Sequence, residues 1–169
     1  TSGTLPLAVT LCGEHVFEAF ISEDHSRTFF HGHTYTANPI ACSVALASLT
    51  LFKSSECVTA REKLERAHRE CAIKLESFST VKNVRVAGTL LAFDCASGAV
   101  SGYLSPISRL AGAFFRSHGI LIRPLGNVIY CLPPYCLSES ETAHLHGALL
   151  EFASHLDKLA LEPSANPSL

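Results

Sequence analysis

Between residues 56 and 160 the apolar residues change repeatedly from the spacing of a helix to the spacing of a strand. We expect the charged face of the first helix, which includes His68, to be solvated. A chain of this order folds as a compact α+β unit, and its last two strands should form a hairpin. The predicted order is helix, strand, strand, helix, strand, strand and helix, at 56–78, 81–86, 90–93, 105–115, 120–122, 128–132 and 138–159.

Residues 1–50 show no closed core of their own. The apolar run at 5–11 suits a buried strand, and a short helix is predicted near 16–21. An ordered loop at 28–39 follows. Small residues then dominate the first half of a helix at 40–52, which should pack closely on something large.

Local signals predict where several helices begin and end. Asn38 is a candidate N-cap for the helix at 40–52, with Pro39 at the first helical position. Ser138 and Glu141 have the spacing of a capping box, which predicts the start of the last helix. Gly119 is placed to stop the helix before it.

Composition restricts the function classes. The chain has 169 residues and a net charge of −2, with 47% hydrophobic and 17% charged residues. This excludes a disordered chain and argues against a nucleic-acid surface. No apolar run reaches the length of a membrane-spanning helix, and the first residues lack the basic segment of a signal peptide. Seven scattered cysteines without a C-x-x-C pair indicate buried thiols in a reducing compartment, so we expect a cytoplasmic protein.

Arg123 is the first candidate for binding chemistry. It follows the apolar run at 119–122 and precedes Pro124, which favours an extended backbone before it. A planar guanidinium at a strand end can hold a carboxylate through two hydrogen bonds. The alternative is a surface arginine in a salt bridge.

The segment HGHTY, at 31–35, is the second candidate. Gly32 allows close approach to the backbone, and the Thr34 hydroxyl and neighbouring N–H groups can donate to an anion such as phosphate. The alternative is a turn with capping residues, in which His33 packs only locally. Neither this segment nor the later His-x-His pair has partners at metal-ligand spacing, so we expect no metal site.

Tyr130 and Tyr135 bracket two prolines that fix an extended loop. Either tyrosine can line a pocket or complete the core, and the sequence leaves both roles open. No G-x-G-x-x-G or Walker-type loop is present, and nothing identifies a nucleophile.

Four segments together resemble the class III pyridoxal-phosphate aminotransferases. They are TSGTLPLAVT, FFHGHTYTANPIACSVALASL, VRVAGTLLAFD and GILIRPLGNVIYCLPPY, in register from Thr1 to about Leu159. The resemblance implies the α/β fold of the fold-type-I PLP-dependent transferases, present as a C-terminal fragment. Residues 1–50 would be the end of the large PLP-binding domain, and residues 51–169 the small C-terminal α+β domain.

The combination of ANPIAC with IRPLGNVIYCLPPY is similar to the branch of this class that acts in biotin synthesis. The resemblance implies a transaminase that uses pyridoxal 5'-phosphate to convert 8-amino-7-oxononanoate to 7,8-diaminononanoate. His33 and Thr34 match cofactor-phosphate positions, in a loop that reaches into the neighbouring subunit of a homodimer. Gly32 and Tyr130 match substrate-side positions. Arg123 matches the arginine that pairs with the carboxylate of the keto-acid substrate.

The amino donor, S-adenosylmethionine or lysine, stays open because His33 stands where many members have proline. The family's Schiff-base lysine lies just before the segment that matches Thr1, so we expect no catalytic residue in this chain and no activity without a missing N-terminal portion. None of the chain's lysines matches that position: Lys53, Lys63, Lys74, Lys82 and Lys158. Two other functions stay open: another class III omega-amino acid aminotransferase, and a non-catalytic interaction domain whose first 50 residues bind a partner.

Overall fold

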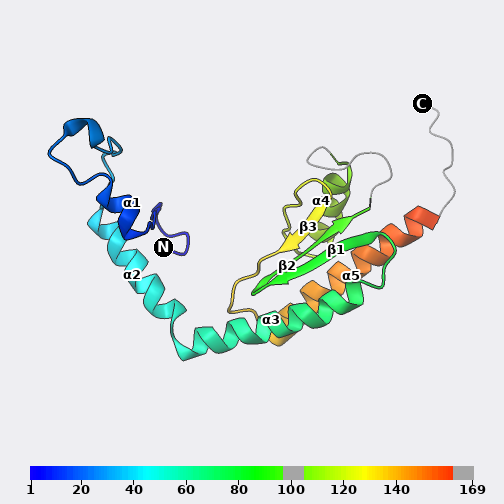
Figure 1. Cartoon of the computed structure of the whole chain (residues 1–169). Coiled ribbons are helices and arrows are strands. Elements are labelled where there is room, and N and C mark those ends of the chain that lie inside the picture. Colours follow the sequence, from blue (N-terminus) through cyan, green and yellow to red (C-terminus); the bar gives the residue numbers. More distant parts are fainter. Residues whose placement is uncertain (97–104, 162–169) are drawn as a thin grey trace. The chain divides into compact units, whose positions relative to one another are not determined.

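The computed structural model describes residues 1–96 and 105–161 (Figure 1). The chain divides into two compact units, Thr1–Ser54 and Ser55–Leu169. The assignment of the first unit to a large domain and of the second to a small domain stays a prediction. The sequence also predicts a turn at Ser97-Gly98, which lies outside the described residues, and a frayed tail at 161–169, of which only residue 161 is described.

The first unit contains a short helix α1 (Glu14–Glu18), a 3-10 turn η1 (His25–Arg27) and a longer helix α2 (Pro39–Phe52). The predicted N-cap of α2 is confirmed. The Asn38 side chain accepts hydrogen bonds from the backbone N–H groups of Ile40, at 3.0 Å, and Ala41, at 3.2 Å. These bonds satisfy two of the N–H groups that a helix start leaves without partners, and Pro39 has no N–H to satisfy.

The first unit has no apolar core. Ala41 is its one buried residue. Large apolar side chains are exposed throughout, among them Leu11 at 90% and Phe30 at 85%. The buried strand expected at 5–11 is wrong: this run is irregular and mostly exposed, because the unit contains no sheet on which it could pair.

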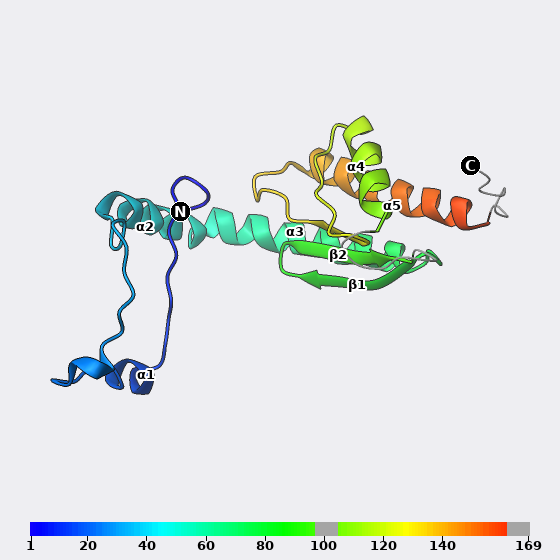
Figure 2. The same ribbon diagram turned by 90° about the horizontal axis from the view of Figure 1, so that it is seen from above.

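The second unit packs three helices on one side of a three-stranded antiparallel sheet (Figure 2). The strand order is β1-β2-β3, and Phe93 of β2 lies opposite Ile129 of β3. The elements are α3 (Ser55–Leu75), β1 (Val81–Ala87), β2 (Leu90–Cys95), α4 (Ile107–Ser117), β3 (Val128–Cys131) and α5 (Glu139–Leu161).

The strand expected at 120–122 is wrong, and so is the hairpin it was to form. These residues are extended without ladder bonds, and β3 pairs with β2 instead. The tight turn itself is present, because Leu125 and Val128 exchange backbone hydrogen bonds of 2.9 and 3.0 Å. The turn therefore brings the chain back along β2 rather than along the segment that precedes it.

The core of this unit lies between the inner face of the sheet and the helices. Every second residue of β2 and β3 points into it, as the strand period requires. Its fully buried members with the largest side chains come from the sheet and from all three helices: Leu75, Leu91, Phe93, Phe115, Ile129, Leu149 and Phe152.

No single helix among the described residues is long and apolar enough to cross a membrane, although α2 and α3 pass that test as a bent pair.

Asp157 ties the end of α5 to the start of β1. Its carboxylate accepts hydrogen bonds from the backbone N–H groups of Ser79, at 3.1 Å, and Thr80, at 2.8 Å, and from both hydroxyls. Burial raises the pKa of this carboxyl, but the hydrogen bonds outweigh that effect and leave the pKa below its ordinary value. The ionised form is therefore the one that the fold prefers.

Replacing Asp157 with Asn should lower the free energy of unfolding by about 1–2 kcal/mol, because charge-assisted hydrogen bonds become neutral ones. Urea unfolding of the chain at pH 7 measures the change. Lys158→Gln, at the exposed neighbouring position, is the control. Because the folded pKa is lowered, the difference between wild type and Asp157→Asn should shrink as the pH falls below about 4. Equal stability of the two variants at pH 7 would contradict this role.

The difference in burial between the units predicts a difference in amide exchange. Backbone amides of residues 1–37 should exchange with solvent within seconds, whereas those of β2 and α5 should be protected, because protection requires buried hydrogen bonds. Hydrogen-exchange mass spectrometry of the chain at low micromolar concentration measures both. Equal protection in the two units would show that the first unit is covered in solution.

Candidate functional site

Arg123 is positioned by the way α4 ends. Gly119 has φ +69°, and its N–H donates to the carbonyl of Arg116 at 3.0 Å, while Ile120 N–H donates to the carbonyl of Phe115 at 2.8 Å. This is a Schellman motif, which needs a residue that tolerates positive φ and reverses the chain at the helix end. The predicted stop at Gly119 is thus confirmed, and the reversed chain leads directly to Arg123.

The turn after Arg123 is anchored to the sheet. Gly126 has φ +65° within it. The carbonyl of Asn127 accepts from the backbone N–H of Cys95 at 2.8 Å, and the Asn127 side chain donates to the Cys95 carbonyl at 3.2 Å. Arg123 therefore lies on a segment held at one end by a helix cap and at the other by β2.

Arg123 and Tyr130 line the same groove. The groove has a volume of about 740 Å³ and runs between the segment at 119–123, the end of β3 with its two prolines, and the first turns of α5. Its walls are largely aliphatic, with contributions from Ile120, Ile122, Leu132 and Leu137. An apolar groove with one guanidinium fits an organic acid that carries an aliphatic chain.

The charges of the groove leave Arg123 available. Arg123 is exposed and forms no ion pair with another described residue, so the alternative of a structural salt bridge is not supported. Glu141, also at the groove, is engaged by Ser138, whose backbone and side chain lower its pKa through hydrogen bonds. This reciprocal arrangement confirms the predicted capping box.

The HGHTY segment forms a turn in the first unit. The backbone N–H of His33 donates to the Thr36 hydroxyl at 3.1 Å, and the N–H of Tyr35 donates to His33 Nδ1 at 3.1 Å. Ala37 completes the turn with φ +55°. His33 is therefore a local capping residue, as the alternative interpretation expected, and its side chain helps to set the conformation of the loop.

The two residues on either side of His33, Gly32 and Thr34, are accessible to groups from outside the unit. Thr34 is exposed and makes no hydrogen bond with any described residue. A Cβ added to Gly32 would meet no atom within 4 Å, so nothing in this unit requires a glycine there. The turn thus presents a hydroxyl and an approachable backbone to a group from outside the unit.

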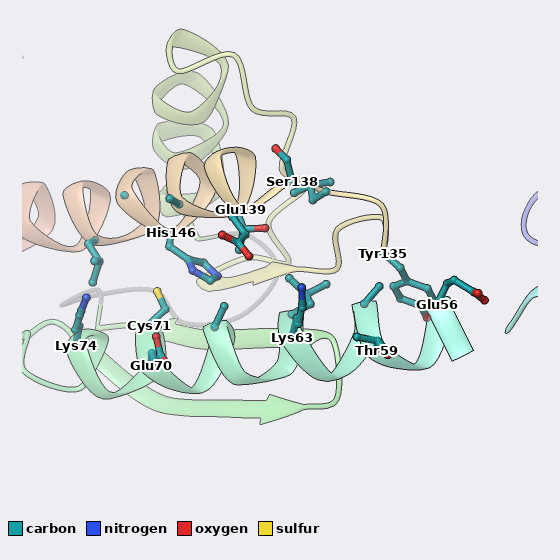
Figure 3. A pocket seen from close by; sticks show the side chains of 18 of the residues that line it. Glu56, Thr59, Lys63, Glu70, Cys71, Lys74, Tyr135, Ser138, Glu139 and His146 are labelled. Atoms are coloured by element: carbon teal, nitrogen blue, oxygen red, sulfur yellow. The ribbon is translucent and has the colours of Figure 1, made fainter. Parts of the chain in front are cut away.

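A second and larger groove, of about 980 Å³, lies between α3 and α5 (Figure 3). It is lined by small residues such as Ala67 and Gly147 and by charged residues such as Lys63 and Glu139. Tyr135 lines this groove, whereas Tyr130 lines the other, which separates the two tyrosines that the sequence could not tell apart.

Of the seven cysteines, only three fit the expectation of buried thiols. Cys71, Cys95 and Cys131 are buried, whereas Cys12 and Cys136 are exposed. Burial raises the pKa of Cys95 and of Cys131 to about 12, so these thiols are neutral and inert. Within residues 1–96 and 105–161, no group of three or more His, Cys, Asp or Glu side chains is arranged to hold a metal ion.

The profile of the class III aminotransferases matches residues 1–152. The chain belongs to this family. It is 38% identical over 156 residues to the adenosylmethionine-8-amino-7-oxononanoate aminotransferase of Synechococcus elongatus, which covers 92% of the chain and 36% of the relative. It is 36% identical over 144 residues, 82% of the chain and 17% of the relative, to the mitochondrial bifunctional dethiobiotin synthetase/7,8-diamino-pelargonic acid aminotransferase of Arabidopsis thaliana.

A solved structure supports the same family. The adenosylmethionine-8-amino-7-oxononanoate aminotransferase of Methanocaldococcus jannaschii superposes with a TM-score of 0.71 at 29% identity, covering 83% of this chain and 33% of that one. The predicted α/β fold of this class is confirmed. The chain spans about a third of the length of such relatives.

Class III aminotransferases depend on pyridoxal phosphate. The open Thr34 hydroxyl fits the phosphate end of that cofactor, because phosphate oxygens accept from hydroxyl and backbone N–H donors. Nothing in the described residues matches the ring end of the cofactor. The structure therefore offers residues for one end of the group only.

Proposed function

We propose that this chain is the C-terminal part of a PLP-dependent transaminase that converts 8-amino-7-oxononanoate to 7,8-diaminononanoate in biotin synthesis. The proposal rests on the similarity of the chain to enzymes named for this reaction. For the relative from Synechococcus elongatus, the similarity covers 92% of the chain. The cofactor supplies the electron sink through which an amino group moves between donor and acceptor. The amino donor is S-adenosylmethionine or lysine.

In this proposal Arg123 holds the carboxylate of the oxo acid through two parallel hydrogen bonds. The aliphatic walls of its groove exclude water from the substrate's methylene chain, and Tyr130 lines the same space. His33 sets the turn so that Thr34 donates to the cofactor phosphate, and Gly32 leaves room for the substrate. These residues bind and orient, and none of them is proposed to move a proton.

Replacing Arg123 with Ala in a complete enzyme that contains this chain should raise KM for the oxo acid about 10- to 100-fold, because a charge-assisted, bidentate contact is lost. Arg123→Lys should recover part of that loss, since it keeps the charge without the planar fork. Arg109→Ala, exposed on α4, is the matched control. An unchanged KM in Arg123→Ala would count against this branch of the family and favour another class III omega-amino acid aminotransferase.

Replacing Thr34 with Val in the same enzyme should raise the dissociation constant of the cofactor about 5- to 20-fold, because one hydroxyl donor to the phosphate is removed. Equilibrium dialysis against pyridoxal phosphate measures this directly. Thr50→Val, an exposed threonine of the same unit, should leave the affinity unchanged. Equal affinities in the two variants would remove Thr34 from the cofactor site.

We further propose that the first unit is covered by the N-terminal portion of the same enzyme or by a second copy in a homodimer. The exposed apolar side chains of that unit support this, since a surface of this kind marks an interaction site. The burial of the thiols of Cys71, Cys95 and Cys131 supports a reducing, cytoplasmic location. Native mass spectrometry of the purified material tests the association, and a lone chain that remains monomeric would favour neither partner.

A further inference from the structure

His68 occupies a place that the helical pattern reserves for an apolar side chain. Leu64, His68, Cys71 and Leu75 follow one another at intervals of four and three along α3, and all four are buried. His68 is 0% exposed. A buried imidazole must have hydrogen-bond partners for its ring nitrogens, because burying a polar group without partners is costly.

Both ring nitrogens of His68 have partners in other elements. Nε2 lies 3.0 Å from the carbonyl oxygen of Thr89, in the turn between β1 and β2, and Nδ1 lies 2.8 Å from Nε2 of His146 on α5. A carbonyl only accepts, so the proton of neutral His68 is on Nε2. Its Nδ1 is then an acceptor, and His146 donates through Nε2–H.

We propose that His68 and His146 form a latch that joins α5 to α3 and to the β1–β2 turn near neutral pH and opens when both rings are protonated. In the neutral pair, Nε2–H of His146 donates to Nδ1 of His68, so both nitrogens of this contact have a hydrogen-bond partner. One added proton can be shared between the rings, since a single N–H still points from one ring to the other. A second added proton places two N–H groups face to face at 2.8 Å and breaks the contact.

The surroundings disfavour the charged rings. Burial is the main cause of the lowered pKa of both histidines, and the Thr89 carbonyl opposes it at His68. The pKa of His146 falls to about 4, because the charges of His68 and Lys74 add to the effect of burial. The neutral pair is therefore the stable form over the physiological range.

The other titratable groups around the latch come from α3, from α5 and from the loop between β3 and α5. Figure 3 shows His146 projecting from α5 toward α3, where Cys71 points toward it. No carboxylate of the described residues lies within ion-pair distance of His146. Burial raises the pKa of Cys71 to about 11, so that thiol is neutral. The titratable groups lining the same groove are Glu56, Lys63, Glu70, Cys71, Lys74, Tyr135 and Glu139.

Urea unfolding of the chain at pH 7 and pH 5 tests the latch. A lowered folded pKa means that the unfolded state binds more protons, so stability is full above about 6.5 and is lost as the pH falls toward 4. From pH 7 to pH 5 the unfolding equilibrium constant of the wild type should rise about 20-fold for a histidine with the pKa of His146. In His146→Gln, which places an amide N–H near the Nε2 position without a titrating ring, this rise should be about 20-fold smaller. His155→Gln, on the same helix, should behave as the wild type.

Nitrogen-15 spectra of the histidine rings provide a second readout that does not depend on a variant's folding. At pH 7 both His68 and His146 of the wild type should be neutral, with the proton on Nε2. Both rings protonated at pH 6, a proton on Nδ1 of neutral His68, or a His146→Gln variant with the wild-type pH dependence, would overturn the proposal. If His146→Gln does not fold at pH 7, the ring spectra of the wild type decide alone.

Discussion

The second unit depends on one apolar layer, in which the inner face of β2 is covered by α3, α4 and α5. Phe93 is completely buried within it, and the rings of Phe115 and Phe152 pack at 5.2 Å between centroids. Each such side chain contributes about 1.5–3 kcal/mol when removed from water. The latch, the Asp157 anchor and the groove of Arg123 are all set into the edges of this layer. The first unit has no equivalent, so its form depends on local hydrogen bonds such as the Asn38 cap.

Signals that act over a few residues were predicted correctly from the sequence. The caps at Asn38 and Ser138 and the stop at Gly119 are each determined by atoms within six residues of one another. Strand pairing depends on partners far along the chain. The runs at 5–11 and 120–122 have strand-like composition, but neither finds a partner strand, and composition alone does not contain that information.

The mistaken placement of His68 has a different cause. Its residue type suggested the solvated face of α3, whereas its position in the apolar stripe indicated burial, and position proved the better guide. The spacing was available in the sequence. The partner that makes burial tolerable, His146, is 78 residues away, and no local pattern identifies it. The sequence can therefore predict that a polar residue at such a position is buried, but it cannot predict which residue is its partner.

The same distinction applies to the two candidate binding segments, each of which lies in its own unit. The sequence identified Arg123 from its proline and apolar run, but the groove that it shares with Tyr130 depends on the pairing of β3 with β2, which the sequence did not predict. All the residues that line that groove belong to the second unit. The turn at Thr34 has its geometry from His33 and Thr36 but no floor of its own. In the proposed enzyme, therefore, the groove that we propose for the acid is preformed by this chain, whereas the turn that we propose for the phosphate gains its binding strength only when other residues cover the first unit.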